Sequence, residues 1–210
     1  MSEKQVLAVD YGASGGRVML GGFDGASFTI SELHRFPNDP VKLGDTMYWD
    51  VLRLYFEMKQ GIVKSKAHGA ISGIGVDTWG VDFGLLDREG RLLDNPVHYR
   101  DGRTAGMMEK TLKMVGRDPL YELTGNQLME INTLFQLMAV KERRPELLER
   151  ADALLLMPDL FQYFLSGEKI SEKSIASTTQ MMDLRQGKWA FGLLETLGLQ
   201  AGMMRDILPG

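Results

Sequence analysis

Short apolar runs alternate with one helically spaced segment in the first third of the chain. Residues 6–9 are wholly apolar, as in a strand buried on both faces, and residues 18–20 form a second such run. Residues 27–36 continue the pattern as a third strand after a turn at residues 23–25. Residues 49–65 place apolar side chains close to helical spacing. The pattern predicts three antiparallel strands followed by a helix.

Two more strands are predicted within residues 71–86, around the segment from Asp77 to Gly80. A strand that follows a helix after an antiparallel start indicates a mixed sheet with helices packed on it, so the expected fold class is α/β. The rest of the chain is mainly helical, with one short extended piece at residues 153–157. The expected helices are 104–115, 119–123, 133–143, 145–150, 158–165 and 191–197.

Three local expectations concern the ends of elements and the connecting segments. Thr133 is the expected N-cap of its helix, because threonine side chains cap helices well. Residues 42–47 are expected to form a loop. Residues 174–180 are polar and β-branched, and we expect a loop there that lies near a site.

Composition narrows the classes of function. The 210 residues suffice for one large domain or two small ones. The net charge of −4, without a basic block, argues against a nucleic-acid partner. The absence of cysteine excludes a disulfide framework, a thiol nucleophile and a cysteine-based metal site. No apolar stretch approaches the ~18 residues of a membrane span, and no signal peptide precedes the first strand, so we expect a cytoplasmic protein.

The strongest candidate for chemistry lies between the first two predicted strands. It is the segment Asp10-Tyr-Gly-Ala-Ser-Gly-Gly-Arg17. Its glycines permit positive φ and leave backbone N–H groups uncovered, so such a turn can cradle phosphate. Asp10 at the mouth of the turn is suited to hold Mg²⁺, usually through waters, and Arg17 supplies a fixed positive charge.

Known phosphate-binding patterns separate the interpretations of this turn. A P-loop needs Gly-Lys-Ser/Thr opening a helix, and no such triplet follows. A dinucleotide-binding fingerprint also needs a helix after the glycines, whereas the residues after Gly16 resemble a strand. Two interpretations remain. One is a phosphate-binding hairpin of the kind found in actin and the sugar kinases, and the other is an ordinary tight hairpin with a surface aspartate.

Five motifs in chain order resemble the N-terminal half of the FGGY carbohydrate kinases. They are Asp10-Tyr-Gly-Ala-Ser-Gly-Gly-Arg17, Gly75-Val-Asp-Thr-Trp-Gly-Val-Asp-Phe83, Tyr99-Arg-Asp-Gly-Arg-Thr104, Asn132-Thr-Leu-Phe-Gln136 and Leu156-Met-Pro-Asp-Leu160. The second motif together with the first is the specific signal, since the hairpin motif alone would indicate only the superfamily. The resemblance implies an actin-like, ribonuclease-H-like domain over residues 1–210, with a mixed five-stranded sheet and flanking helices. It also implies that a C-terminal ATP-binding domain is absent.

The resemblance further implies transfer of the γ-phosphoryl group of ATP to a sugar hydroxyl. Within the family the chain most resembles the members that phosphorylate L-rhamnulose at O1. The implied ATP-phosphate contacts are Ala13, Ser14, Gly15, Gly16 and Arg17, with Arg17 stabilising charge. Asp10 matches the carboxylate that organises Mg²⁺, and Gly80 matches a sugar-contacting position. As a hypothesis of our own, Trp79 gives an apolar wall to the deoxy end of the sugar.

Several polar residues allow both a site role and a scaffold role. Asp77 and Asp82 could hydrogen-bond sugar hydroxyls or accept backbone N–H groups at strand ends. For the group Arg100, Asp101 and Arg103, an ion-paired turn is favoured over a phosphate site. Gln127 and Asn132 lie on a segment that contacts substrate in relatives. The histidines are not spaced as metal ligands.

The resemblance also says what this chain lacks. In the family the general base is an aspartate early in the second domain, and most adenine-binding residues lie there too. We therefore expect the 210 residues to have no kinase activity alone. The alternatives are another FGGY kinase that acts on fuculose, xylulose or a related polyol, and a non-catalytic actin-like ATP-binding module. The expected partners are ATP, the sugar and the chain's own C-terminal domain.

Overall fold

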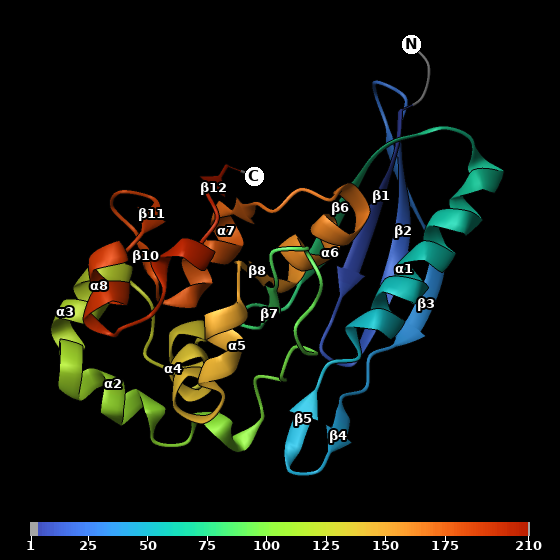
Figure 1. The fold of residues 1–210 in the computed structure, drawn as a ribbon. Coiled ribbons are helices and arrows are strands. Elements are labelled where there is room, and N and C mark those ends of the chain that lie inside the picture. The colour runs from blue at the N-terminus through green and yellow to red at the C-terminus, as the bar shows by residue number, and fades with distance from the viewer. Residues whose placement is uncertain (1–3, 210) are drawn as a thin grey trace. The chain divides into compact units, whose positions relative to one another are not determined.

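The computed structural model describes residues 4–209, which form two compact units (Figure 1). Unit 1 contains the chain up to Val41 and the segment Asp50–Trp79. Unit 2 contains Lys42–Trp49 and the chain from Gly80 onward. Each unit has its own secondary structure and its own polar network.

Unit 1 is built on a mixed sheet with the strand order β3-β2-β1-β6. The first three strands run antiparallel to their neighbours, and β6 runs parallel to β1. The strands are β1 (Lys4–Tyr11), β2 (Gly15–Phe23), β3 (Phe28–Pro37) and β6 (Ile71–Thr78). The hydrophobic pattern predicted this meander and its parallel fourth strand.

Helix α1 (Val51–Ser65) lies along one face of this sheet and is followed by the 3₁₀ turn η1 (Lys66–His68) (Figure 1). The Asp50 side chain caps the helix by accepting from the Arg53 N–H at 3.0 Å. The Tyr11 hydroxyl donates to the Leu54 carbonyl at 2.9 Å, which joins β1 to the helix. Alternate residues of β1 and β2 therefore face α1, and the residues between them face away from it.

The expected five-stranded sheet has four strands in the described residues. The strand at residues 153–157 does form, as β8 (Ala153–Leu156), but it pairs antiparallel with β7 (Phe83–Leu86) in unit 2. Bridges from Leu86 to Leu92 and from Leu154 to Met204 add further pairing to these two strands. Because β8 finds backbone partners on both sides within unit 2, it forms a separate ladder there.

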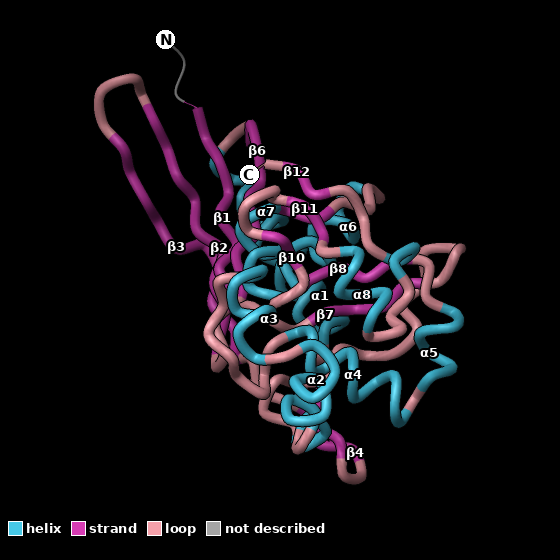
Figure 2. The backbone as a smooth tube through the Cα atoms, turned by 90° about the vertical axis from the view of Figure 1, so that its left-hand side faces the viewer, coloured by secondary structure: helices cyan, strands magenta, loops and turns pink. Residues whose placement is uncertain are grey.

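Helices are the main secondary structure of unit 2, and they are the cyan segments from α2 onward in Figure 2. Their apolar faces share a core with β7 and β8 that includes Phe135, Leu154 and Leu194, all at most 1% exposed. The helices are α2 (Met107–Val115), α3 (Arg117–Thr124), α4 (Thr133–Arg143), α5 (Pro145–Arg150), α6 (Met157–Ser166), α7 (Lys173–Ala176) and α8 (Phe191–Thr196). The expected helices are all present, with ends shifted by at most three residues.

Short elements complete the fold of unit 2. The strand pairs are β4 (Val41–Leu43) with β5 (Thr46–Tyr48), β9 (Ser171–Glu172) with β12 (Ile207–Leu208), and β10 (Met182–Asp183) with β11 (Lys188–Trp189). The 3₁₀ turns are η2 (Gly102–Thr104), η3 (Ser177–Thr179) and η4 (Ala201–Met203).

The structure corrects three local expectations. Residues 42–47 contain most of the β4–β5 hairpin, which turns at Gly44 with φ of 60° and is too short to show a period-two pattern. Residues 174–180 contain most of α7 and all of η3, because the Glu172 side chain caps α7 by accepting from the N–H groups of the next turn. Asn132, not Thr133, is the N-cap of α4, since the Thr133 hydroxyl donates to the Val81 carbonyl at 2.7 Å.

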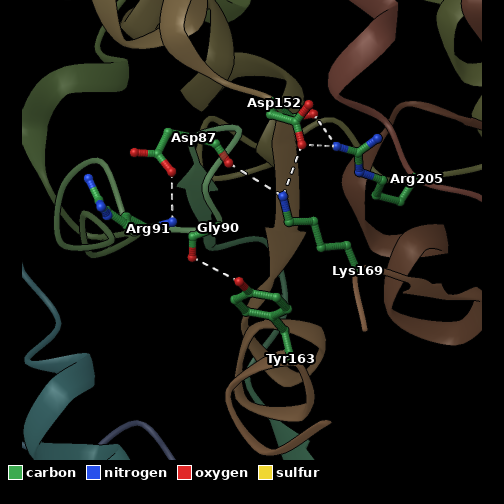
Figure 3. Close-up of polar contacts among 7 residues, drawn as sticks. All are labelled: Asp87, Gly90, Arg91, Asp152, Tyr163, Lys169 and Arg205. Carbon is green, nitrogen blue, oxygen red and sulfur yellow. Dashed lines mark hydrogen bonds and ion pairs between the residues drawn. The ribbon is translucent and has the colours of Figure 1, made fainter. Parts of the chain in front are cut away.

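A charged network ties the ends of β7 and β8 to later parts of unit 2 (Figure 3). Asp152 lies between Lys169 and Arg205, with the Lys169 Nζ at 3.0 Å from its Oδ2. These two cations hold the pKa of Asp152 below its usual value, chiefly through the Lys169 hydrogen bond. The Tyr163 hydroxyl donates to the Gly90 carbonyl at 2.8 Å and anchors α6 on the turn after β7.

Candidate functional site

The glycine-rich turn joins β1 directly to β2 as a hairpin. The Gly12 N–H donates to the Gly15 carbonyl at 2.9 Å, and β2 begins at Gly15. Asp10 pairs in register with Arg17 across the hairpin. A strand therefore follows the glycines, which excludes the P-loop and dinucleotide interpretations.

The glycines of the turn serve close approach, and positive φ is not the reason for them. Gly12, Gly15 and Gly16 are all outside the left-handed region, which corrects that part of the sequence argument. A Cβ on Gly16 would lie 2.4 Å from the Phe36 ring, and one on Gly12 would lie 3.0 Å from the Gly15 carbonyl oxygen. Side chains at these positions would push the hairpin and β3 apart.

Replacing Gly16 by alanine tests this packing reason. We expect the substitution to destabilise unit 1 by about 1–3 kcal/mol, because the added methyl overpacks the site against Phe36. Gly73→Ala in β6 is the matched control, since a Cβ there meets nothing within 4 Å. Equal denaturation midpoints for the two variants would show that Gly16 is not fixed by packing.

Two backbone amides at the tip of the turn are available to a ligand. Ala13 and Ser14 are exposed, and among residues 4–209 neither N–H has a hydrogen-bond partner. Asn38 holds the turn from the other side, because its Nδ2 donates to the Gly12 carbonyl at 2.8 Å and its N–H to the Ser14 carbonyl at 3.3 Å. Neighbouring free amides of this kind can bind an anion.

Four charged residues form a row across the sheet beside this turn. The register places Asp77 of β6 next to Asp10, Asp10 next to Arg17, and Arg17 next to Arg35 of β3. The row lies on the face opposite to α1, since Tyr11 faces the helix. Arg17 Nε lies 2.8 Å from Asp10 Oδ2, and Arg35 pairs with Glu32, which lowers the pKa of that carboxyl.

The turn and three residues of the row, all but Asp77, line one open hollow of about 660 Å³ in unit 1. Its lining includes Asp10, Ser14, Arg17 and Arg35. Within residues 4–209, no three His, Asp or Glu side chains gather as a metal cage, so a cation at Asp10 would need further oxygen ligands from water or a substrate. The hollow is suited to a polyphosphate with its cation.

Sequence reasoning missed one residue of this hollow. It did not include Arg35, which lies next to Arg17 only because of the β2–β3 register. The structure also places Asp77, a candidate for sugar binding, beside Asp10 in the sheet, and its part in sugar binding stays a prediction. The strand alternation of residues 28–37 could have indicated Arg35 if the register had been known.

The candidate sugar residues are divided by the boundary between the units, which falls between Trp79 and Gly80. Asp77 and Trp79 belong to unit 1, where Asp77 is exposed and Trp79 is half-buried. Gly80 belongs to unit 2 and begins a tight turn, in which the Asp82 N–H donates back to the Gly80 carbonyl at 2.9 Å.

Asp82 is fully buried behind this turn and has a scaffold role in the structure. Its Oδ2 accepts from Trp49 Nε1 at 2.6 Å and from the Tyr99 N–H at 3.1 Å, and its Oδ1 accepts from Gln136 Nε2 at 2.8 Å. Arg103 is close enough to interact with this carboxylate. Of the two alternatives left by the sequence, the contacts favour acceptance of N–H groups within the fold.

Two basic side chains in this part of unit 2 have pKa values below their usual ranges. Burial lowers the pKa of Arg103 to about 10, which leaves it charged at neutral pH. Burial, with the Arg100 charge, lowers the pKa of His98 to about 4, so this imidazole is neutral where it stacks on Trp49 at 4.0 Å between ring centroids. Asp101 anchors the turn by accepting from the Met47 N–H at 2.8 Å and the Arg103 N–H at 2.9 Å.

Comparison with known proteins identifies the family. The family model for the N-terminal domain of the FGGY family of carbohydrate kinases matches residues 5–210. The chain belongs to the FGGY family of carbohydrate kinases.

The chain is 41% identical over 205 residues to the rhamnulokinase of Oceanobacillus iheyensis, covering 97% of this chain and 43% of that protein. It is 39% identical over 211 residues to the rhamnulokinase of Bacteroides thetaiotaomicron, covering 99% of this chain and 43% of that protein. The chain thus spans less than half the length of these curated relatives.

Solved structures of FGGY kinases confirm the expected actin-like, ribonuclease-H-like α/β fold with its mixed sheet. A gluconate kinase from Lactobacillus acidophilus superposes with a TM-score of 0.85 at 16% identity, covering 99% of this chain and 42% of that one. A xylulose kinase from the same organism superposes with a TM-score of 0.82 at 15% identity, covering 98% and 42%. No helix in residues 4–209 is long and apolar enough to cross a membrane.

Proposed function

We propose that this chain is the N-terminal half of an ATP- and Mg²⁺-dependent kinase that converts L-rhamnulose to L-rhamnulose 1-phosphate. The observation that carries the proposal is the hollow of unit 1, where free amides and two arginines lie beside Asp10. Two curated relatives that match nearly the whole chain, at 41% and 39% identity, are rhamnulokinases, which supports the sugar.

The residues of the hollow fit the demands of phosphoryl transfer, which are positioning and neutralisation of charge. In this proposal the turn at Ala13, Ser14 and Gly15 binds the ATP phosphates through its backbone. Gly16 shapes the turn by its packing under Phe36. Arg17 leaves its pair with Asp10 and neutralises phosphate charge, which frees Asp10 to hold a hydrated Mg²⁺. The metal supplies further charge neutralisation when it is bound.

The sugar residues of the proposal are Gly80, Trp79 and Asp77. The missing side chain at Gly80 lets the sugar lie against the backbone, and Trp79 gives an apolar wall to its deoxy end. Asp77 stands beside Asp10 in the sheet. In this proposal its carboxylate accepts a hydrogen bond from a sugar hydroxyl.

The general base and most of the adenine site belong, in this proposal, to a C-terminal domain. The relatives' additional length leaves room for such a domain, since the chain covers only 43% of each. We therefore expect the 210 residues alone to release no ADP in the presence of ATP and L-rhamnulose. The same segment joined to its C-terminal domain is expected to release ADP at a rate typical of sugar kinases.

A ketose panel tests both parts of this proposal. L-rhamnulose, L-fuculose and D-xylulose are compared by kcat/KM with the two-domain enzyme, and L-rhamnulose is expected to be preferred. Preference for another ketose would replace the substrate but keep the kinase. Full turnover by the 210 residues alone would contradict the placement of the base, and ATP binding without transfer to any sugar would favour the non-catalytic module.

A further inference from the structure

The turn that contains Gly80 has a backbone conformation that its own sequence disfavours. Val81 has a φ of 68°, and a β-branched residue in the left-handed region is a rare outlier. The hydrogen bond from the Asp82 N–H to the Gly80 carbonyl closes a three-residue turn of the strained kind. Helix α4 holds this strain, because the Thr133 hydroxyl donates to the Val81 carbonyl at 2.7 Å. Strain of this kind is concentrated at ligand sites.

A second strained residue of unit 2 is linked to the first. Gln180, which ends η3, has a φ of 62° and is fully buried. Its Oε1 accepts from the Asn132 Nδ2 at 2.7 Å, and Asn132 immediately precedes the Thr133 that holds Val81. In the described residues, the Gln180 Nε2 is buried without a hydrogen-bond partner. Such an unpaired group is costly and needs a reason.

Thr178 lies in η3, two residues before the strained Gln180, and its side chain is next to Gly80. A Cβ on Gly80 would lie 3.3 Å from the Thr178 Oγ1 and 3.5 Å from its Cβ. Thr178 is half-buried, and its hydroxyl donates to the Ile175 carbonyl at 2.8 Å. That bond uses the only proton of the hydroxyl and fixes its direction, so the oxygen can still accept a hydrogen bond.

We propose that Thr178 is a specificity-determining residue for the sugar, and that Gln180 is the residue that positions it. The Thr178 oxygen accepts a hydrogen bond from a sugar hydroxyl next to Gly80, and its methyl group limits the space for substituents at that carbon. Gln180 ends η3 in the strained conformation and, through Asn132, fixes η3 against the Gly80 turn. This inference rests on the proposed function, because it requires that the sugar bind at Gly80.

Thr178→Val in the two-domain enzyme tests the contact, because valine keeps the shape and loses the acceptor. We expect the KM for L-rhamnulose to rise about tenfold, the effect of one lost hydrogen bond, with the KM for ATP unchanged. Thr178→Ser keeps the acceptor and is expected to restore the KM to within about threefold of the unsubstituted enzyme, with weaker discrimination among ketoses. Gln180→Gly tolerates the backbone conformation but loses the Asn132 contact, and we expect it to raise the ketose KM with the ATP KM unchanged.

Ser177→Ala is the matched control, because Ser177 makes the same kind of local bond, to the Ser174 carbonyl at 2.6 Å, one residue away. It is expected to leave both KM values unchanged. The inference is overturned if Thr178→Val leaves the ketose KM unchanged, raises both KM values equally, or differs in no respect from Ser177→Ala. If the unsubstituted two-domain enzyme phosphorylates no ketose, the proposed function fails instead, so the two failures are distinguishable.

Discussion

Replacing Arg17 by alanine in the two-domain kinase is expected to lower kcat by about 10²- to 10³-fold, the usual loss when one preorganised charge-stabilising group is removed. Arg17 lines the hollow and lies between Asp10 and Arg35 in the charged row. Its guanidinium is therefore placed to neutralise charge on transferring phosphate. Steady-state kinetics with saturating ATP and L-rhamnulose measures the effect.

The same substitution should hardly change stability. The Arg17–Asp10 pair is roughly half exposed, with side-chain exposures of 46% and 39%, and pairs of this kind contribute about 0–1 kcal/mol. Arg53→Ala is the matched control, because Arg53 is an exposed arginine of unit 1 that pairs with Glu57 outside the hollow. An Arg17→Ala enzyme that keeps kcat within about threefold of the control would show that Arg17 has no part in the transfer.

Replacing Asp82 by alanine is expected to lower the free energy of unfolding of unit 2 by about 3–5 kcal/mol, because the partners of a buried carboxylate would lose their acceptor. Those partners are the Trp49 indole, the Tyr99 amide and the Gln136 side chain. The buried Arg103 would also lose its nearby negative charge. Urea denaturation followed by helical circular dichroism reports mainly on unit 2, where α2 to α8 lie, with a smaller contribution from α1 of unit 1.

Two further variants make this result specific. Asp82→Asn keeps a carbonyl oxygen as an acceptor but brings in an amide donor, so its loss should fall between that of alanine and zero. Asp118→Ala removes an exposed aspartate from the first turn of α3 and should cost only a few tenths of a kcal/mol. If Asp82→Ala and Asp118→Ala have the same denaturation midpoint, the scaffold role of Asp82 is wrong.

The sequence pattern predicted the helices and the hairpin, whose formation depends on residues close together in the chain. The bounds of α4 and α5 match the expected 133–143 and 145–150. A proline at the start of α5 and helical spacing in α4 fix these bounds within a few residues. The β1–β2 hairpin was predictable for the same reason, since two apolar runs flank a glycine-rich turn.

Long-range pairing was not predictable from the same patterns. The β7–β8 ladder, the position of Asp77 beside Asp10 and the inclusion of Arg35 all depend on strand register between distant segments. The strain at Val81 depends on Thr133, which lies 52 residues later in the sequence. A single sequence carries no local signal for contacts of this range. The glycine-rich turn of the candidate site could therefore be predicted, but the residues that lie beside it on neighbouring strands could not.

The central claim is that the β1–β2 turn binds the phosphates of ATP through its backbone. The most direct measurement is a titration of the ¹⁵N-labelled 210-residue chain with MgATP, followed by the amide resonances of Ala13 and Ser14. The account predicts that these two resonances shift with MgATP and with magnesium triphosphate, and do not shift with adenosine. Resonances that stay in place with millimolar MgATP, or that shift equally with adenosine, would contradict it.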